Sequence, residues 1–428
     1  MPGERSADNK QGRQRGESVR EFFRKHYHWV TVALCCGMSG TVLGVSSNSM
    51  GVFYLPVSRE LGVGVGDVAL YLTIMSATFG LLAPLVVRHM RTIPLRLMLG
   101  VGTALAAACY VLLSLATAIW QFYAIALILG VAHAYTGLIV GNVVLGNWFE
   151  KKMGTATGLY MGIAGIIGAI FSPVFSGLIE KIGWRPVYLI AGALVVIFML
   201  PAVLFLHKTP EEIGLRKYGE DETEQKSSRG FALNLTEEEK YPFRSSANVW
   251  MLVLSGLTAF AACMCHHLSA FSESIGHTAA FGAMMISVGM VGNIVTKVAS
   301  GVLSDAIGSV RATALFLIAA IAGCLAMAWM PGVSAVLFVG GFLLSSYFAT
   351  SGVSNLGMIK ERFKAEDFAR ICGVMSIFRS IGAAVAYSLI GYSYDFFGTY
   401  NPALYACAAM GAVSLIGVIL IGRGQKKA

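Results

Sequence analysis

Long apolar stretches recur from one end of the chain to the other, and they limit the possible folds more than any other feature. Apolar and aromatic residues make up 56% of the 428 residues, only 13% are charged, and the mean hydropathy is +0.68. A water-soluble protein does not have this composition. A helix of about 20 apolar residues crosses the hydrocarbon core of a bilayer. Stretches of that length lie near residues 29–56, 67–87, 95–115, 119–146, 153–178, 185–206, 248–271, 278–301, 311–330, 333–358, 369–394 and 401–421.

The polar segments between these stretches predict how the chain is divided. Six spans precede a long hydrophilic segment and six follow it, so we expect an all-α polytopic membrane protein with twelve transmembrane helices in two six-helix halves. We expect no signal peptide, because the hydrophilic start of the chain has no short apolar core or cleavage site. The predicted parts are an N-tail (1–28), an N-terminal half (29–206), a linker (207–247), a C-terminal half (248–422) and a C-tail (423–428).

The positive charges lie almost entirely on one side of the predicted spans. If the N-terminus is cytosolic, 27 of the 32 Lys and Arg residues fall in cytosolic segments and three in the opposite loops. The positive-inside rule then predicts a multi-pass protein of the plasma (cytoplasmic) membrane with both termini in the cytosol. The formal net charge of +9 follows from this topology and does not indicate a nucleic-acid partner. The two remaining basic residues, Lys297 and Arg379, lie inside spans eight and eleven.

The sequence predicts neither a cofactor nor a metal site. It contains no GxxxxGK(S/T) phosphate-binding loop, so we do not expect ATP to drive the protein directly. All eight cysteines lie within spans, where they behave as small apolar residues, and we expect no disulfides. Span seven carries a cluster of Cys263, Cys265, His266 and His267. At 100° per helical residue only Cys263 and His267 share a face, so the cluster is not expected to bind a metal.

Lys297 and Arg379 are the strongest candidates for a functional site. Lys297 comes eight residues before Asp305 at the cytosolic end of span eight, which places it about 12 Å deep at 1.5 Å per residue. Arg379 follows Arg370 by nine residues and lies about 14 Å deep by the same measure. A charge at this depth costs about 2.5 to 3.5 kcal/mol or more on insertion scales, so its default interpretation is functional.

The two cations are predicted to bind an anionic substrate. No carboxylate lies in the interior of any predicted span, so neither cation has a counter-ion from the protein. Arg379 can grip a carboxylate with two hydrogen bonds, and Lys297 supplies a point charge. Asn293 and Ser376 lie one turn away and can add neutral donors. The alternative is that one cation, Arg379 in particular, snorkels or pairs with backbone carbonyls.

Two further polar features each leave two interpretations open. His133 in span four is either a residue of the substrate pathway or a neutral imidazole hydrogen-bonded to a neighbouring helix. The polar run from Ser46 to Ser49 in span one either lines an outer vestibule or makes hydrogen bonds between helices.

The turn that follows Lys297 resembles the signature loop of the major facilitator superfamily of secondary transporters. The resemblance rests on Gly301, Leu303, Asp305, Gly308 and Arg311. In that loop the glycines allow close helix packing, while the carboxylate pairs with a cation and caps a neighbouring helix N-terminus. The resemblance therefore implies gating roles for Gly301, Asp305, Gly308 and Arg311.

The first half carries a degenerate copy of this loop. Gly80, Leu82 and Ala83 repeat its start, but Pro84 stands where the aspartate is expected. The resemblance thus implies the major facilitator fold, in which two six-helix halves are related by pseudo-symmetry.

A narrower resemblance points to the oxalate/formate antiporter branch and its monocarboxylate transporter relatives. It implies an alternating-access carrier of small carboxylates in which Lys297 and Arg379 bind the anion. The oxalate carriers have arginine in span eight and lysine in span eleven, which is the reverse of the order here. The residues that carry this resemblance are Asn293, Lys297, Gly301, Ser304, Asp305, Gly308, the segment GVMSIFR at 373–379, the segment NWFEKKMGTATG at 147–158 and the segment TPEEIG at 209–214.

We therefore expect secondary active transport of small mono- or dicarboxylates by anion exchange, and no enzymatic activity. The alternative mechanism is proton-coupled monocarboxylate symport, for which His133 is the candidate titrating group. A non-transporting membrane sensor is disfavoured because the tails and the linker carry no effector domain. The expected partners are the carboxylate, membrane lipid and, for symport, protons, and we expect the monomer to be functional.

Overall fold

The computed structural model describes residues 26–219, 246–362 and 365–425. Most of the predicted N-tail, linker and C-tail lies outside these ranges. Within them the chain is almost entirely helical, with a single isolated bridge between Phe149 and Tyr218. The prediction of an all-α polytopic membrane protein is confirmed.

The described residues contain eleven helices that are long and apolar enough to cross a membrane, or twelve if one bent pair counts as a span. The predicted spans match them to within about five residues at nearly every end. The unbroken spans are α5 (Leu95–Leu115), α8 (Met153–Ile182), α9 (Trp184–Phe205), α12 (Ala279–Ile307), α13 (Ser309–Trp329), α17 (Ala365–Phe397) and α18 (Asn401–Gln425).

The other spans are built from shorter helical pieces. The first contains η1 (Gly40–Asn48), η2 (Met50–Phe53) and α2 (Tyr54–Leu61), and the fourth consists of α6 (Ile119–Thr136) and α7 (Leu138–Trp148). The seventh consists of α10 (Ser246–Ala262), η5 (Cys263–His267) and α11 (Leu268–Ser274). The tenth consists of α14 (Ser334–Leu344), α15 (Ser346–Ala349), η6 (Thr350–Ser354) and α16 (Asn355–Arg362). These irregular spans are every third one, which is the periodicity expected of two pseudo-symmetric halves.

The second span is longer than predicted and bent. Its two helices, α3 (Val65–Leu81) and α4 (Ala83–Thr92), meet at 50°. Pro84 occupies the first turn of α4, where it has no N–H to donate to the preceding turn. The degenerate signature loop of the first half is therefore a helix bend followed by ten further helical residues.

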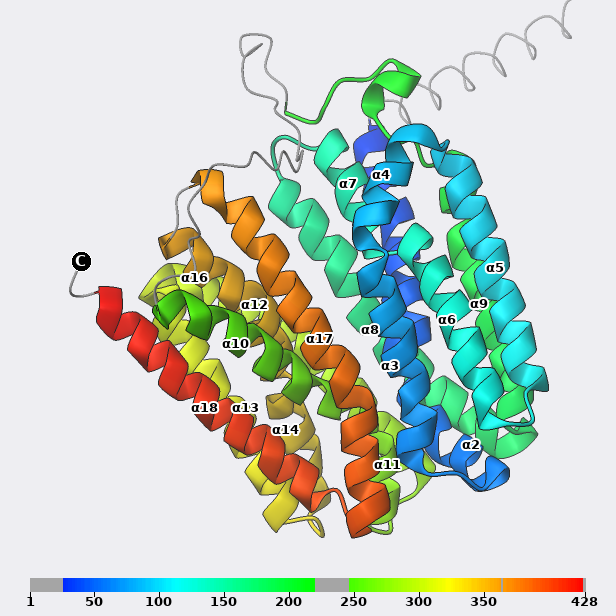
Figure 1. Cartoon of the computed structure of the whole chain (residues 1–428), viewed down its shortest axis with the longest axis vertical. Coiled ribbons are helices and arrows are strands. Elements are labelled where there is room, and N and C mark those ends of the chain that lie inside the picture. The colour runs from blue at the N-terminus through cyan, green and yellow to red at the C-terminus, as the bar shows by residue number, and fades with distance from the viewer. Residues whose placement is uncertain (1–25, 220–245, 363–364, 426–428) are drawn as a thin grey trace, which may run out of the picture.

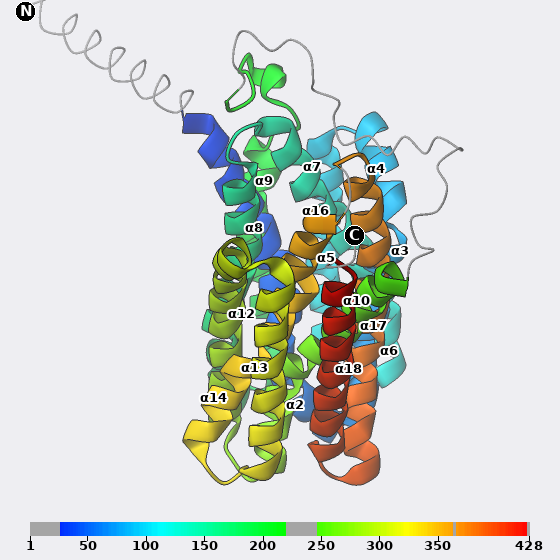
Figure 2. The same cartoon turned by 90° about the vertical axis from the view of Figure 1, so that its left-hand side faces the viewer.

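The two halves lie side by side, with the N-terminal half in blue to green and the C-terminal half in green to red (Figure 1). Two helix pairs make the principal contacts between the halves, α3 with α17 and α8 with α12. We call the end of the molecule that carries α4, α7 and α16 the linker side, because the described residues that follow α9 also lie there (Figures 1 and 2). The opposite end, with α2 and α11, is the far side.

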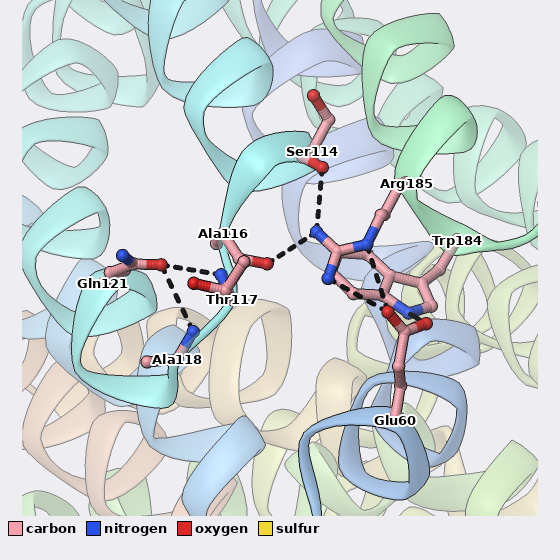
Figure 3. Close-up of polar contacts among 8 residues, drawn as sticks. All are labelled: Glu60, Ser114, Ala116, Thr117, Ala118, Gln121, Trp184 and Arg185. Atoms are coloured by element: carbon pink, nitrogen blue, oxygen red, sulfur yellow. Dashed lines mark hydrogen bonds and ion pairs between the residues drawn. The ribbon is translucent and has the colours of Figure 1, made fainter.

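A network of polar contacts ties the far-side loops of the N-terminal half together (Figure 3). The Glu60 carboxylate of α2 accepts hydrogen bonds from the Trp184 indole at 2.6 Å and from the Arg185 guanidinium at 3.0 and 3.1 Å. The same guanidinium donates to the carbonyl oxygens of Ser114 and Ala116 at the end of α5. Three separate segments are thus bound to one another, as expected of a half that moves as a rigid body.

Apolar side chains cover the outer faces of the helices. On α17, Ile377, Ile381 and Val385 are spaced four residues apart and are all exposed. This spacing places them on one face, which contacts lipid in a membrane-embedded helix.

Candidate substrate site

Lys297 and Arg379 extend from the two helices of the C-terminal half that pack against the N-terminal half. Lys297 is half-buried in α12, and its ammonium lies 5.9 Å from the centre of the Phe348 ring. Arg379 is exposed on α17. Arg379 is close enough to Lys297 for the two positive charges to interact. The two cations that the sequence predicts to bind one anion are thus neighbours.

The face of α17 that carries Arg379 opens toward the linker side and is closed toward the far side. Ser376 and Arg379 are exposed, whereas Tyr387 and Ile390, farther along the same face, are buried. This face lies opposite the apolar stripe that begins at Ile377. The exposed cation therefore faces the interior of the bundle and not the lipid.

The corresponding face of α12 shows the same gradient. Met290 and Asn293 are buried, Lys297 and Gly301 are half-buried, and Asp305 near the end of the helix is exposed. The exposure of side chains thus changes in the same direction along α12 and α17. Along these faces both helices are more exposed toward the linker side than toward the far side.

The neutral residues beside the cations are Ser376 and Asn293. The Ser376 hydroxyl donates to the Cys372 carbonyl of its own helix at 2.8 Å. Asn293 is 7% exposed, and its Oδ1 atom has no hydrogen-bond partner in the described structure. The Asn293 amide one turn from Lys297 is therefore an unsatisfied polar group.

Within the described ranges, neither Lys297 nor Arg379 forms an ion pair. The ion pairs that are present, Arg59 with Glu273 and Arg185 with Glu60, lie at the far side. Lys297 has the face of an aromatic ring as its neighbour, which interacts favourably with a cation but does not neutralise its charge.

Acidic residues close the far side between the halves, a role that the sequence did not predict. Both oxygens of Asp395, near the end of α17, accept backbone N–H groups at the start of α3, from Val65 at 2.8 Å and from Gly66 at 2.7 Å. The Tyr392 hydroxyl donates to Asp67 at 2.9 Å. The carboxylate of Asp395 therefore caps a helix of the opposite half.

Small residues allow the backbones of α3 and α17 to come close at this closure. A methyl group on Gly391 would lie 2.6 Å from the Cα atom of Gly66, closer than real side-chain contacts allow. About two turns deeper, the Thr73 hydroxyl donates to the Ala384 carbonyl at 2.6 Å. The sequence shows that these acidic residues lie at the ends of spans. It does not show which helix of the other half each of them contacts.

The histidine cluster of span seven lies deeper in the same closure. The segment η5 is a 3₁₀ helix rather than an α-helix. Cys263 and His267 nevertheless contact the same helix, α17, because the Cys263 thiol donates to the Ala383 carbonyl at 3.6 Å and the Nε2 atom of His267 lies 2.9 Å from the Tyr387 carbonyl oxygen. The His267 ring also contacts the other half, where its centre lies 4.9 Å from that of Tyr54.

The signature turn has the predicted glycine but a different cap. Gly308 ends α12 with a φ of 87°, a conformation that favours glycine. Asp305 and Arg311 are exposed, and the N-terminus of α13 is capped by Glu361, which accepts from the Ser309 N–H at 2.8 Å. A methyl group on Gly301 would meet only Val353, at 4.0 Å, so this glycine makes no close helix contact in the present conformation.

His133 and the serine run lie in the N-terminal half. His133 is buried near the end of α6, its carbonyl oxygen faces Gly137, and its Nε2 atom has no partner in the described structure. Both interpretations of His133 therefore remain open. In the serine run, Ser46 accepts from the Tyr110 hydroxyl at 2.6 Å and Asn48 donates to the Ala164 carbonyl at 2.9 Å, so hydrogen bonding between helices is confirmed.

Comparison with known proteins agrees with this architecture. The monocarboxylate transporter 3 of Mus musculus is 28% identical over 169 residues, which is 39% of this chain and 34% of that protein, so the match spans about a third of the relative. A probable L-galactonate transporter of Escherichia coli is 21% identical over 411 residues, covering 92% of this chain and 89% of the relative. The crystal structure of the nucleoside transporter NupG superposes with a TM-score of 0.71 at 11% identity, covering 92% of this chain and 99% of that one. At this identity the likeness shows the fold alone.

The family model described as Major Facilitator Superfamily matches residues 32–358 and 268–428, which together include nearly all of the described chain. The helical spans and the two halves that meet through α3, α8, α12 and α17 point to a transporter rather than an enzyme. The chain is a multi-pass membrane transporter and belongs to the Major Facilitator Superfamily.

Proposed function

We propose that this transporter carries small carboxylates, mono- or dicarboxylates, by alternating access and exchanges one anion for another. The observation that carries the proposal is the pair formed by Lys297 and Arg379. Two like charges that repel each other and form no ion pair in the described structure require an anion to neutralise them. Arg379 binds the carboxylate with its planar fork, and Lys297 adds a point charge from the opposite helix.

The energetics of the empty site favour exchange. When the halves close around the site, water leaves and the repulsion between two uncompensated cations grows in the lower dielectric. A bound anion removes this penalty, so the loaded carrier changes sides more readily than the empty one. Release of one anion is therefore followed by binding of another before the carrier returns.

Two of the relatives support the class of substrate. Their names describe a monocarboxylate transporter and a probable L-galactonate transporter, and both names refer to carboxylates. The second relative matches over nearly its whole length, which makes the correspondence more informative than its low identity suggests.

The test is flux of radiolabelled carboxylates into proteoliposomes that contain the purified protein. Acceleration by unlabelled anion inside indicates exchange, and acceleration by a proton gradient indicates the symport alternative. Binding without flux would indicate a sensor and would contradict the proposal. Lys297→Met and Arg379→Met should abolish flux, whereas Arg91→Met, which removes an exposed cation of α4 outside the site, should not.

The proposed membrane and the orientation of the transporter in it follow from the distribution of positive charges along the chain. The positive-inside rule places the linker side in the cytosol and both termini with it, in the plasma (cytoplasmic) membrane. The greater exposure of α12 and α17 toward the linker side then supports an inward-open state. One chain contains both halves and both cations, so the monomer is the functional unit.

A further inference from the structure

The far-side closure contains a buried histidine whose hydrogen bonds define its protonation state. His267 is 0% exposed, and its Nε2 atom lies 2.9 Å from the carbonyl oxygen of Tyr387. A carbonyl oxygen only accepts hydrogen bonds, so Nε2 must carry the hydrogen. In the neutral ring the other nitrogen, Nδ1, is then a bare acceptor. It is buried and has no partner in the described structure.

The other half contributes an unsatisfied group beside this ring. Tyr54 of α2 is 2% exposed, its ring centre lies 4.9 Å from that of His267, and its hydroxyl also lacks a partner within the described residues. The Tyr400 hydroxyl, on a ring 5.9 Å away, is unsatisfied as well. Buried polar groups are rarely left unpaired, so three such groups around one ring mark a site that can take up a proton or a hydrogen bond.

Among the described residues, no ion pair or hydrogen bond joins His267 to a carboxylate in the closed state. Asp395 and Glu273 lie near Tyr400, a neighbour of the ring. Both have other partners, since Asp395 caps α3 and Glu273 pairs with Arg59. The other titratable groups around the ring are histidine, cysteine and tyrosine side chains, namely His266, Cys263 and Cys265 on η5, Tyr54 on α2, Tyr387 on α17, Tyr400 before α18 and Cys407 on α18.

The cluster lies where the halves must separate when the far side opens. Tyr54 belongs to the N-terminal half and His267 to the C-terminal half. The backbones of the two halves are also close here, because a methyl group on Gly51 would collide with the His266 carbonyl. The halves also meet at Tyr387, whose hydroxyl oxygen lies 3.4 Å from that of Ser47. Opening therefore admits water to the bare Nδ1 atom, and closing removes that water.

We propose that His267 is a proton-binding site of the far-side gate, which takes up a proton at Nδ1 when the gate is open and must lose it before the gate closes. Protonation adds an N–H donor and a charge at Nδ1, and the closed cluster offers neither an anion nor bulk water to stabilise them. The closed gate thus selects the neutral ring, and acid on the far side holds the gate open. The proposal rests on the alternating access of the proposed function but not on the chemistry of its substrate.

The test measures the width of the far-side gate in the absence of any substrate. Spin labels are placed at Lys181→Cys on α8 and Ala280→Cys on α12, two exposed positions in opposite halves, and the half-buried Cys36 and Cys372 are replaced by alanine. Distances are measured by double electron–electron resonance at two pH values on either side of the range in which an ordinary histidine titrates. A single coupled proton changes the ratio of open to closed gates by at most about tenfold per pH unit.

The proposal predicts that the long-distance population rises several-fold from the higher to the lower pH and that His267→Gln abolishes this rise. Glutamine can still donate to the Tyr387 carbonyl but cannot be protonated, and His267→Asn serves if the glutamine variant does not fold. The matched controls His266→Gln and Glu273→Gln should keep the pH response. The proposal is wrong if the parent protein shows no response, if the response survives in the His267 variant, or if it disappears in either control. Loss of carboxylate exchange with a retained gate response would contradict the proposed substrate and leave this site supported.

Discussion

Replacing Asp395 with asparagine should shift the transporter toward the state that is open at the far side. In the closed state both carboxylate oxygens accept backbone N–H groups of the opposite half, from Val65 and Gly66. Asparagine keeps one acceptor oxygen but turns an NH₂ group toward the other N–H, so one hydrogen bond is lost and one donor is left unpaired. The negative charge at the N-terminus of α3 is lost as well.

The size of the shift follows from these two losses. A hydrogen bond to a charged group contributes about 1.5 to 3 kcal/mol, and a charge at a helix N-terminus about 0.3 to 1 kcal/mol. Asp395 is exposed, so solvent screening places the expected change toward the lower end, at about 1.5 to 2.5 kcal/mol. This corresponds to a change of roughly 10- to 60-fold in the ratio of open to closed gates.

The assay is the distance between spin labels on the far-side ends of α8 and α12, compared in the parent protein and in Asp395→Asn. Glu60→Gln is the matched control, because it removes a carboxylate on the same side whose described partners, Trp184 and Arg185, lie within one half (Figure 3). The reasoning is refuted if Asp395→Asn leaves the distance distribution unchanged, or if Glu60→Gln shifts it equally.

Three further predictions concern the substrate site and the signature turn. Lys297→Met and Arg379→Met should abolish exchange while leaving insertion intact and the substrate-free melting temperature equal or higher, because each replaces an uncompensated charge with an apolar chain; unchanged stabilisation by the same carboxylate in either variant would place the anion site elsewhere. Asp305→Asn should slow turnover more than it weakens substrate binding, because Asp305 lies about 12 Å from Lys297 along α12; equal losses of affinity and turnover, with normal distance changes, would contradict this. His133→Ala should weaken any pH dependence of exchange without abolishing it, and loss of exchange in well-folded protein would place His133 in the binding site.

The amino-acid sequence by itself determined the features that depend on local composition. A helix of about 20 apolar residues is inserted because of its own hydropathy, so the spans could be placed before any contact between them was known. The same reasoning identified Lys297 and Arg379, since a cation within such a span is costly wherever the neighbouring helices lie. The glycine that ends α12 was also predictable, because it serves a local turn.

The tertiary structure alone decided which residues of the two halves meet. Asp395 and Val65 are 330 residues apart, and no local pattern pairs a carboxylate at one span end with the N-terminus of another helix. The contact between the rings of His267 and Tyr54 likewise joins spans seven and one, which no local pattern pairs. The side on which the site is open is a property of one conformation of the two halves, and a sequence that encodes alternating states does not state which of them is occupied.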